Sequence, residues 1–145
     1  MIALVRHLRR RILGIRGDFD ITGRRGERAA ATFLRRAGYR VIARNVHVEF
    51  GELDLLCLAP DRRTIVAVEV KTRRLDPTAS TDPHRPAFPA EAKANAEKRR
   101  KVLSIVRHLA RANGWADRPL RVDVVGVDLP LRGRPAVRHH VNVPA

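Results

Sequence analysis

Two short apolar runs constrain the fold most, because each carries charged residues where a buried strand is normally apolar. Residues 53–58 are apolar apart from Asp54, and residues 65–70 are apolar apart from Glu69, with Lys71 directly after them. Runs of this length predict buried strands. A carboxylate in such a strand costs free energy unless positive charge compensates it. Because side chains two apart share one face of a strand, Glu69 and Lys71 point the same way.

Two carboxylates and a lysine that converge at the edge of a sheet can hold Mg²⁺ and activate a water molecule. This pattern predicts a metal-dependent nuclease with Asp54, Glu69 and Lys71 as its catalytic residues. The alternative is a purely structural ion pair between Glu69 and Lys71. Lysine stands at only four of the 30 basic positions. Its use in a buried strand favours a role for a compact, titratable ammonium.

The charge of the chain limits the class of partner. The formal net charge is +15 and the pI is about 11.7, which predicts a polyanion, with nucleic acid ahead of an anionic membrane surface. Aromatic residues make up 4% of the chain, so base stacking is not expected to be the main contact. Basic side chains would instead bind phosphates in a salt-dependent way. The candidate phosphate contacts are Arg73, Arg74, Lys98, Arg99 and Arg100.

Length and cysteine content favour one cytoplasmic domain. A chain of 145 residues predicts a single domain with a sizeable core. The lone Cys57 excludes an internal disulfide and fits a reducing compartment. The sequence contains no run of about 18 apolar residues, so it predicts no transmembrane helix. We expect residues 1–21 to form a poorly ordered basic arm and residues 22–145 to form the folded domain.

The hydrophobic patterning predicts an α/β fold in the order α-β-β-β-α-β-β, with helices flanking a mixed central sheet. Thr22 is the expected N-cap of the first helix. The first three strands are expected to form an antiparallel meander, and a proline-rich loop follows them at residues 76–89. The expected helices are 24–37 and 90–112, and the expected strands are 39–46, 52–58, 64–72, 121–129 and 137–143.

Four further positions carry polar groups that need an explanation. Glu27 falls on the apolar face of the first helix, in line with Ala30 and Leu34. Asp123 lies in a predicted strand, where it is either a structural partner of a basic residue or a peripheral member of the site. His139 and the histidine after it are expected at a strand end that faces solvent.

Five motifs, in order along residues 22–143, resemble the YraN-like family of mostly uncharacterised bacterial proteins. This family is similar to the archaeal Holliday junction resolvases of the restriction-endonuclease-like superfamily. The chain departs from the family at His47, where most members have arginine. It departs from the superfamily signature at Leu53, where that signature has proline. The loop at residues 76–89 also looks longer than usual. The matching motifs are Gly26-Glu27, Asn45, residues 51–55, residues 68–73 and residues 121–123.

The resemblance implies a restriction-endonuclease-like fold and a catalytic set of Asp54, Glu69 and Lys71. Asp54, Glu69 and Glu27 would bind Mg²⁺ or Mn²⁺, and Glu52 and Asp123 would support these ligands. The expected substrate is DNA rather than RNA, including branched or structured DNA. Resolvases that cut a junction symmetrically work as dimers, so the resemblance is compatible with a homodimer. The alternative function is a non-catalytic nucleic-acid-binding protein on a nuclease scaffold.

Overall fold

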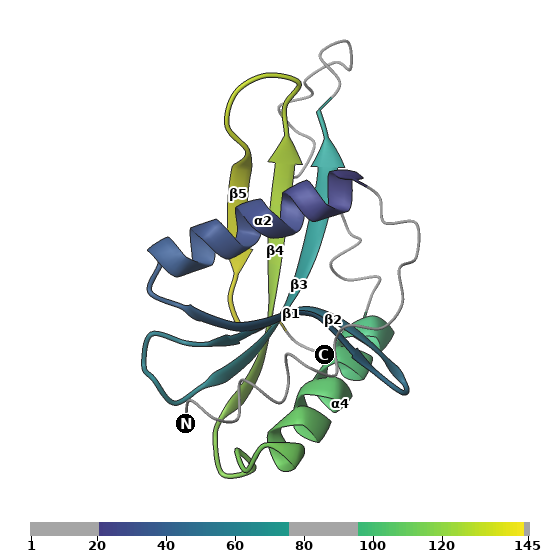
Figure 1. The fold of residues 1–145 in the computed structure, drawn as a ribbon, viewed down its shortest axis with the longest axis vertical. Coiled ribbons are helices and arrows are strands. Elements are labelled where there is room, and N and C mark those ends of the chain that lie inside the picture. The colour runs from purple at the N-terminus through teal and green to yellow at the C-terminus, as the bar shows by residue number, and fades with distance from the viewer. Residues whose placement is uncertain (1–20, 76–95, 144–145) are drawn as a thin grey trace.

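The protein has a mixed α/β fold, and the computed structural model describes residues 21–75 and 96–143 (Figure 1). A five-stranded mixed sheet is accompanied by two helices in the described part, in the predicted order α-β-β-β-α-β-β. Neither of these helices is long and apolar enough to cross a membrane. The elements are α2 (Ile21–Arg36), β1 (Arg40–Val48), β2 (Gly51–Leu58), β3 (Ile65–Arg74), α4 (Ala96–Ala112), β4 (Leu120–Leu129) and β5 (Ala136–His140).

The strands lie in the sheet in their sequence order, from β1 to β5. Strands β1, β2 and β3 pair antiparallel, which confirms the predicted meander, and β4 pairs antiparallel with β5. Strands β3 and β4 are parallel. A parallel pair needs a long crossover connection rather than a tight turn, and the chain between these two strands includes α4.

The two helices cover opposite faces of the sheet. Because alternate residues of a strand point to opposite faces, Val66 and Val68 pack in the cluster that contains Leu34 of α2. The intervening Ala67 packs in the cluster that contains Ile105 and Val106 of α4. Each helix therefore buries one apolar stripe, and most of its basic side chains stay on the outside; Arg99 of α4 is buried.

Strand β2 separates from β3 halfway along its length, and this separation creates the candidate site. The two strands pair only from Leu55 to Leu58, opposite Val68 to Ile65. Beyond that point β2 stays paired with β1, whereas β3 continues along β4 as far as Arg74. Figure 1 shows β1 and β2 turning away at a steep angle from β3, β4 and β5. Within the described residues, the edge of β3 is thus open from Glu69 onward.

Helix α2 lies so close to β3 that it needs glycine at one position. A Cβ atom on Gly26 would overlap the side chain of Thr72. We expect Gly26→Ala to lower the free energy of unfolding by about 1–3 kcal/mol, because overpacking forces the helix or the strand to shift. Gly23→Ala is the matched control, since a Cβ there has nothing within 4 Å and alanine favours a helix by up to about 1 kcal/mol. Urea denaturation of both variants checks this, and equal stabilities would contradict the close packing.

Three predicted boundaries need correction. Thr22 is not an N-cap, because it already lies inside α2, as does Ile21 of the predicted arm. The last strand ends at His140 rather than at residue 143, because Asn142 takes a left-handed conformation with a φ of 54°. Helix α4 ends at Ala112 as predicted. The proline-rich loop, the first residues of the predicted second helix and residues 1–20 lie outside the described residues.

Candidate active site

A cavity of about 260 Å³ opens where β2 leaves β3, beneath the first turns of α2. It brings together three of the residues predicted from the sequence, Glu27, Asp54 and Lys71. They come from three different elements, so the separation of the strands and the docking of α2 are both needed to assemble the site. The lining residues are Thr22, Gly23, Glu27, Asp54, Val70, Lys71 and Thr72.

Asp54 replaces a missing strand partner. Its Oδ2 accepts a hydrogen bond from the backbone N–H of Val70 at 2.7 Å, at the point where β2 no longer supplies a carbonyl to β3. Burial is the main cause that raises the pKa of Asp54. The Val70 hydrogen bond and the positive charge of Lys98 oppose this shift, whereas the negative charge of Glu69 adds to it.

Glu27 faces Asp54 from helix α2. Burial raises the pKa of Glu27, and the negative charge of Asp54 raises it further. A hydrogen bond from the side chain of Asn45 opposes the shift, as does the charge of Arg44. Two carboxyl groups with raised pKa values therefore share one cavity, where burial is the main cause that disfavours their ionised forms.

Glu69 is balanced by two lysines. It is only 3% exposed, and its Oε1 lies 2.7 Å from Nζ of Lys71 and 2.9 Å from Nζ of Lys98. Burial alone would raise the pKa of Glu69, but the hydrogen bonds from the two lysines outweigh burial and lower it. The ion pair between Glu69 and Lys71 that the sequence suggested is present, and Lys98 of α4 joins it.

The three predicted metal ligands are not gathered in one cluster. Within residues 21–75 and 96–143, no three His, Cys, Asp or Glu side chains lie close enough to share an ion. Glu27 and Asp54 line the cavity, whereas Glu69 does not. Glu52 is 72% exposed in its side chain and lies 3.6 Å from His47. It contributes to the site only through its negative charge near Asp54.

The predicted phosphate contacts differ in their surroundings. Arg74 and Arg100 are exposed, as expected. Arg73 donates from Nε and Nη2 to Asp128, so part of its guanidinium is already engaged. A phosphate contact of this kind is predicted to face solvent, but Arg99 is only 6% exposed. This prediction was wrong because Arg99 lies three residues before Val102, on the buried side of α4.

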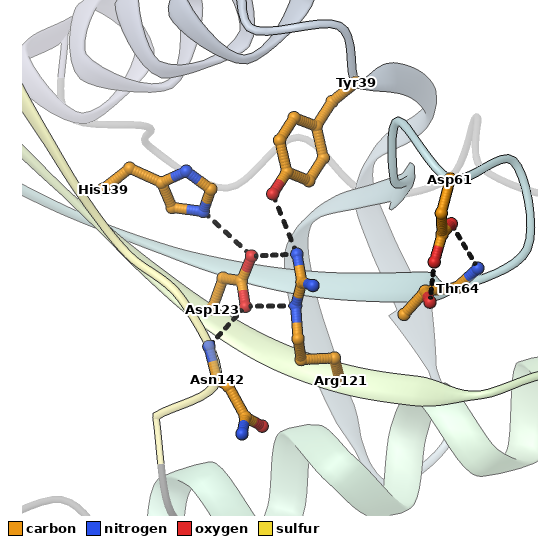
Figure 2. A network of polar contacts seen from close by, with 7 residues as sticks. All are labelled: Tyr39, Asp61, Thr64, Arg121, Asp123, His139 and Asn142. Carbon is orange, nitrogen blue, oxygen red and sulfur yellow. Dashed lines mark hydrogen bonds and ion pairs between the residues drawn. The ribbon is translucent and has the colours of Figure 1, made fainter.

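Asp123 lies at the centre of a buried polar network outside the cavity (Figure 2). It is 0% exposed and accepts hydrogen bonds from both Nε and Nη2 of Arg121 and from the backbone N–H of Asn142. Nε2 of His139 lies 2.8 Å from Asp123, and Arg121 also donates to the hydroxyl of Tyr39. These contacts support the structural alternative for Asp123. They also show that the solvent-facing position predicted for His139 was wrong.

Sequence reasoning gave no role to Asn45, although the residue belongs to one of the five motifs. Asn45 combines a φ of 48° with a side-chain hydrogen bond to Glu27. A lone asparagine inside an otherwise strand-like segment was the available signal, because asparagine is rare in strands and tolerates left-handed backbone.

Fold and site together define a mixed α/β protein with a cavity that is lined by two carboxylates and a lysine at an open strand edge. The chain belongs to Uncharacterised protein family UPF0102, whose model matches residues 26–127. This confirms the expectation of an uncharacterised family.

Three relatives are each named only as a UPF0102 protein. The relative from Pelobacter propionicus is 35% identical, with 88% of this chain and 84% of the relative covered. The Symbiobacterium thermophilum relative is 44% identical, with 77% and 86% covered. The Nocardia farcinica relative is 38% identical, with 88% and 92% covered.

A solved structure, that of Pyrococcus furiosus SfsA in complex with Ca²⁺, is similar at a TM-score of 0.28 and 15% identity. The similarity covers 81% of this chain and 61% of that chain. A similarity this weak says nothing about the fold or function of this protein.

Proposed function

We propose that this protein is a metal-dependent phosphodiesterase with a restriction-endonuclease-like fold that cleaves DNA, including branched or structured DNA. The observation that carries the proposal is the cavity in which Glu27, Asp54 and Lys71 meet. Raised pKa values at both carboxyl groups support it, because such shifts cluster at functional sites. The net charge of +15 supports a polyanionic substrate.

The donor set of the cavity fits a hard divalent cation such as Mg²⁺ or Mn²⁺. Glu27 and Asp54 offer carboxylate oxygens, the ligands that these ions take, and positive charge would relieve the repulsion that Asp54 exerts on Glu27. These two residues would hold the ion, with Glu69 close enough to act on Asp54 electrostatically. A bound ion lowers the pKa of water and neutralises negative charge on a scissile phosphate.

Lys71 supplies the positive charge of the cavity wall. Its ammonium lies 2.7 Å from Glu69, and the lowered pKa of Glu69 keeps that carboxylate ionised at neutral pH. Glu69 thereby fixes the direction of the lysine side chain. From this position Lys71 can orient the attacking water and stabilise the charge that develops on the phosphate. Lys98, on the same carboxylate, adds to the positive potential.

Arginines outside the cavity would bind the rest of the substrate. Arg74 and Arg100 are exposed, and Arg73 is fixed by Asp128. Contacts of this kind bind phosphates with little regard to sequence and weaken as salt rises. Cleavage of a panel of linear, nicked and four-way DNA with Mg²⁺ or Mn²⁺ tests the proposal. Absence of cleavage with every divalent ion would reject it.

A second candidate is a nucleic-acid-binding protein that keeps the nuclease scaffold without catalysis. The neutralisation of Glu69 by two lysines favours it, as does the absence of a three-ligand cluster in the described part of the chain. Isothermal titration separates the two functions. A binding protein would take up no Mg²⁺ or Mn²⁺, and its Asp54→Ala variant would bind DNA as tightly as the wild type.

We expect Lys71→Arg to fold normally and to bind DNA with near-native affinity, yet to lose at least about tenfold in cleavage rate, or roughly 1.4 kcal/mol of barrier. The planar guanidinium is bulkier and cannot act as a base, so it would misplace the attacking water. Single-turnover cleavage and fluorescence anisotropy measure the two effects. The control is Lys101→Arg, at an exposed position of α4. Cleavage at the wild-type rate would show that Lys71 is only a structural charge.

A further inference from the structure

Asn45 interrupts strand β1 at the level of the candidate active site. Its φ of 48° places it in the left-handed region, which non-glycine residues rarely adopt and asparagine tolerates better than most. The two other non-glycine residues with positive φ in the described chain, Arg62 and Asn142, lie outside the strands. Asn45 is therefore a local irregularity inside a paired strand, and such irregularities gather at functional sites.

The irregularity lies opposite Asp54. Arg44 pairs with Leu55 and Val46 pairs with Leu53, so Asn45 and Asp54 occupy the position between these two pairs. This is also the level at which β2 leaves β3 and Asp54 turns to the N–H of Val70. The backbone of β1 is thus distorted where the carboxylate of β2 enters the cavity.

The side chain of Asn45 reaches helix α2. Its amide hydrogen-bonds to the carboxyl group of Glu27, and Glu27 lines the cavity next to Asp54. Glutamate has three rotatable side-chain bonds and keeps one orientation only when a partner holds it. Asn45 and its contact therefore connect β1 with α2 at the one acidic side chain that α2 contributes to the cavity.

We propose that Asn45 is a positioning residue of the active site, whose left-handed backbone turns its amide toward α2 and whose amide holds Glu27 beside Asp54. The role rests on the proposed phosphodiesterase function. Residues that hydrogen-bond to metal ligands orient those ligands in the same way. Substitution of such residues lowers ion affinity or activity by about 10- to 100-fold.

Two substitutions test whether the side-chain amide of Asn45 positions Glu27 or whether only the left-handed backbone at this residue matters. Asn45→Gly adopts positive φ without strain but has no amide. Asn45→Asp keeps the shape of the side chain and tolerates the same backbone, but its carboxylate cannot donate to Glu27. If only the backbone mattered, both variants would behave as the wild type does. If the amide positions Glu27, both are defective.

We expect both variants to lose about 10- to 100-fold in kcat and in Mn²⁺ affinity, with KM for DNA changed by less than about twofold. We expect kcat to fall while KM for DNA stays nearly constant, because arginines outside the cavity would make most of the contacts to DNA. Asn142→Gly is the matched control, since Asn142 has a φ of 54° and uses its backbone N–H, not its side chain, to bond to Asp123. This control should cleave and bind Mn²⁺ as the wild type does.

The contact itself can be observed without ion or substrate. The side-chain amide resonance of Asn45 in a ¹H–¹⁵N spectrum should move in Glu27→Ala and stay unchanged in Glu49→Ala, a substitution in the exposed turn between β1 and β2. A resonance that stays in place in Glu27→Ala would overturn the inference.

The kinetic outcomes distinguish the two proposals. A wild type that binds Mn²⁺ and cleaves DNA, together with Asn45→Gly and Asn45→Asp variants that match it, overturns the positioning role and leaves the phosphodiesterase intact. A wild type that neither binds the ion nor cleaves removes the proposed function, and the positioning role falls with it.

Discussion

Asp54→Asn is expected to lose at least about 1000-fold in Mg²⁺-dependent cleavage, equivalent to roughly 4 kcal/mol of barrier. The substitution removes one of the two carboxylates that line the cavity. It should preserve the fold, because an amide oxygen can still accept the hydrogen bond from Val70 that Asp54 accepts at 2.7 Å. Single-turnover cleavage gives the rate, and circular dichroism checks the fold. Asp117→Asn, in an exposed turn, is the control that should cleave normally.

The same variant should also lose stabilisation by the ion. A raised pKa means that the ionised form is disfavoured in the folded state, so the stability contributed by Asp54 and Glu27 is present at low pH. It is lost as pH rises through their folded pKa values. An ion that neutralises both groups should therefore raise the Tm of the wild type at neutral pH and leave that of Asp54→Asn almost unchanged. Cleavage by Asp54→Asn at the wild-type rate would show that Asp54 takes no part in the cleavage reaction.

Asp123→Ala is expected to lower the free energy of unfolding by about 3–5 kcal/mol, the usual cost of breaking a buried charge pair from one side. The substitution leaves Arg121 and His139 without the carboxylate that they contact in the interior (Figure 2). It also removes the acceptor for the backbone N–H of Asn142. Urea denaturation measures the loss. The exposed control, Asp117→Ala, should change stability by no more than about 0.5 kcal/mol.

The pH dependence of stability gives an independent check on Asp123. Burial would raise the pKa of Asp123, but hydrogen bonds from His139 and Arg121 outweigh burial and lower it. Its contribution to stability is therefore present above the unfolded pKa and lost as pH falls through the folded pKa. Asp123→Ala should show a flatter decline in stability on acidification than the wild type. An equally steep decline would mean that Asp123 is not ionised in the fold.

Strands β2 and β3 could be predicted from the sequence because each is built around one short apolar run. Residues 53–58 and 65–70 gave β2 and β3 to within two residues at their starts, and the meander followed from the turns between them. The separation of β2 from β3 could not be predicted, because it depends on a side chain that replaces a backbone partner. Nothing in the sequence near Asp54 says that its carboxylate accepts the N–H of Val70.

Site residues could be predicted where their type conflicts with the local hydrophobic pattern. They were missed where their role depends on partners that are distant in the sequence. Glu27 stood out on an apolar helix face, and the structure places it in the cavity with Asp54. His139 looked like a solvent-facing strand end, because its burial depends on Asp123 and on the ring of Tyr39, which come from other elements. Asn45 was missed, although a lone asparagine in a strand-like segment is a signal of left-handed backbone.

The parallel pairing of β3 with β4 favours an order of folding in which the local strands pair first. Asp54 and Val70 are 16 residues apart in the chain, whereas Arg73 and Asp128 are 55 residues apart. Closing the longer segment costs more entropy, and non-local strand pairs form slowly. The hairpin of β2 and β3 can therefore form before β4 arrives. Lys98, which lies on that longer segment, completes the balance of charge around Glu69 only when the crossover docks.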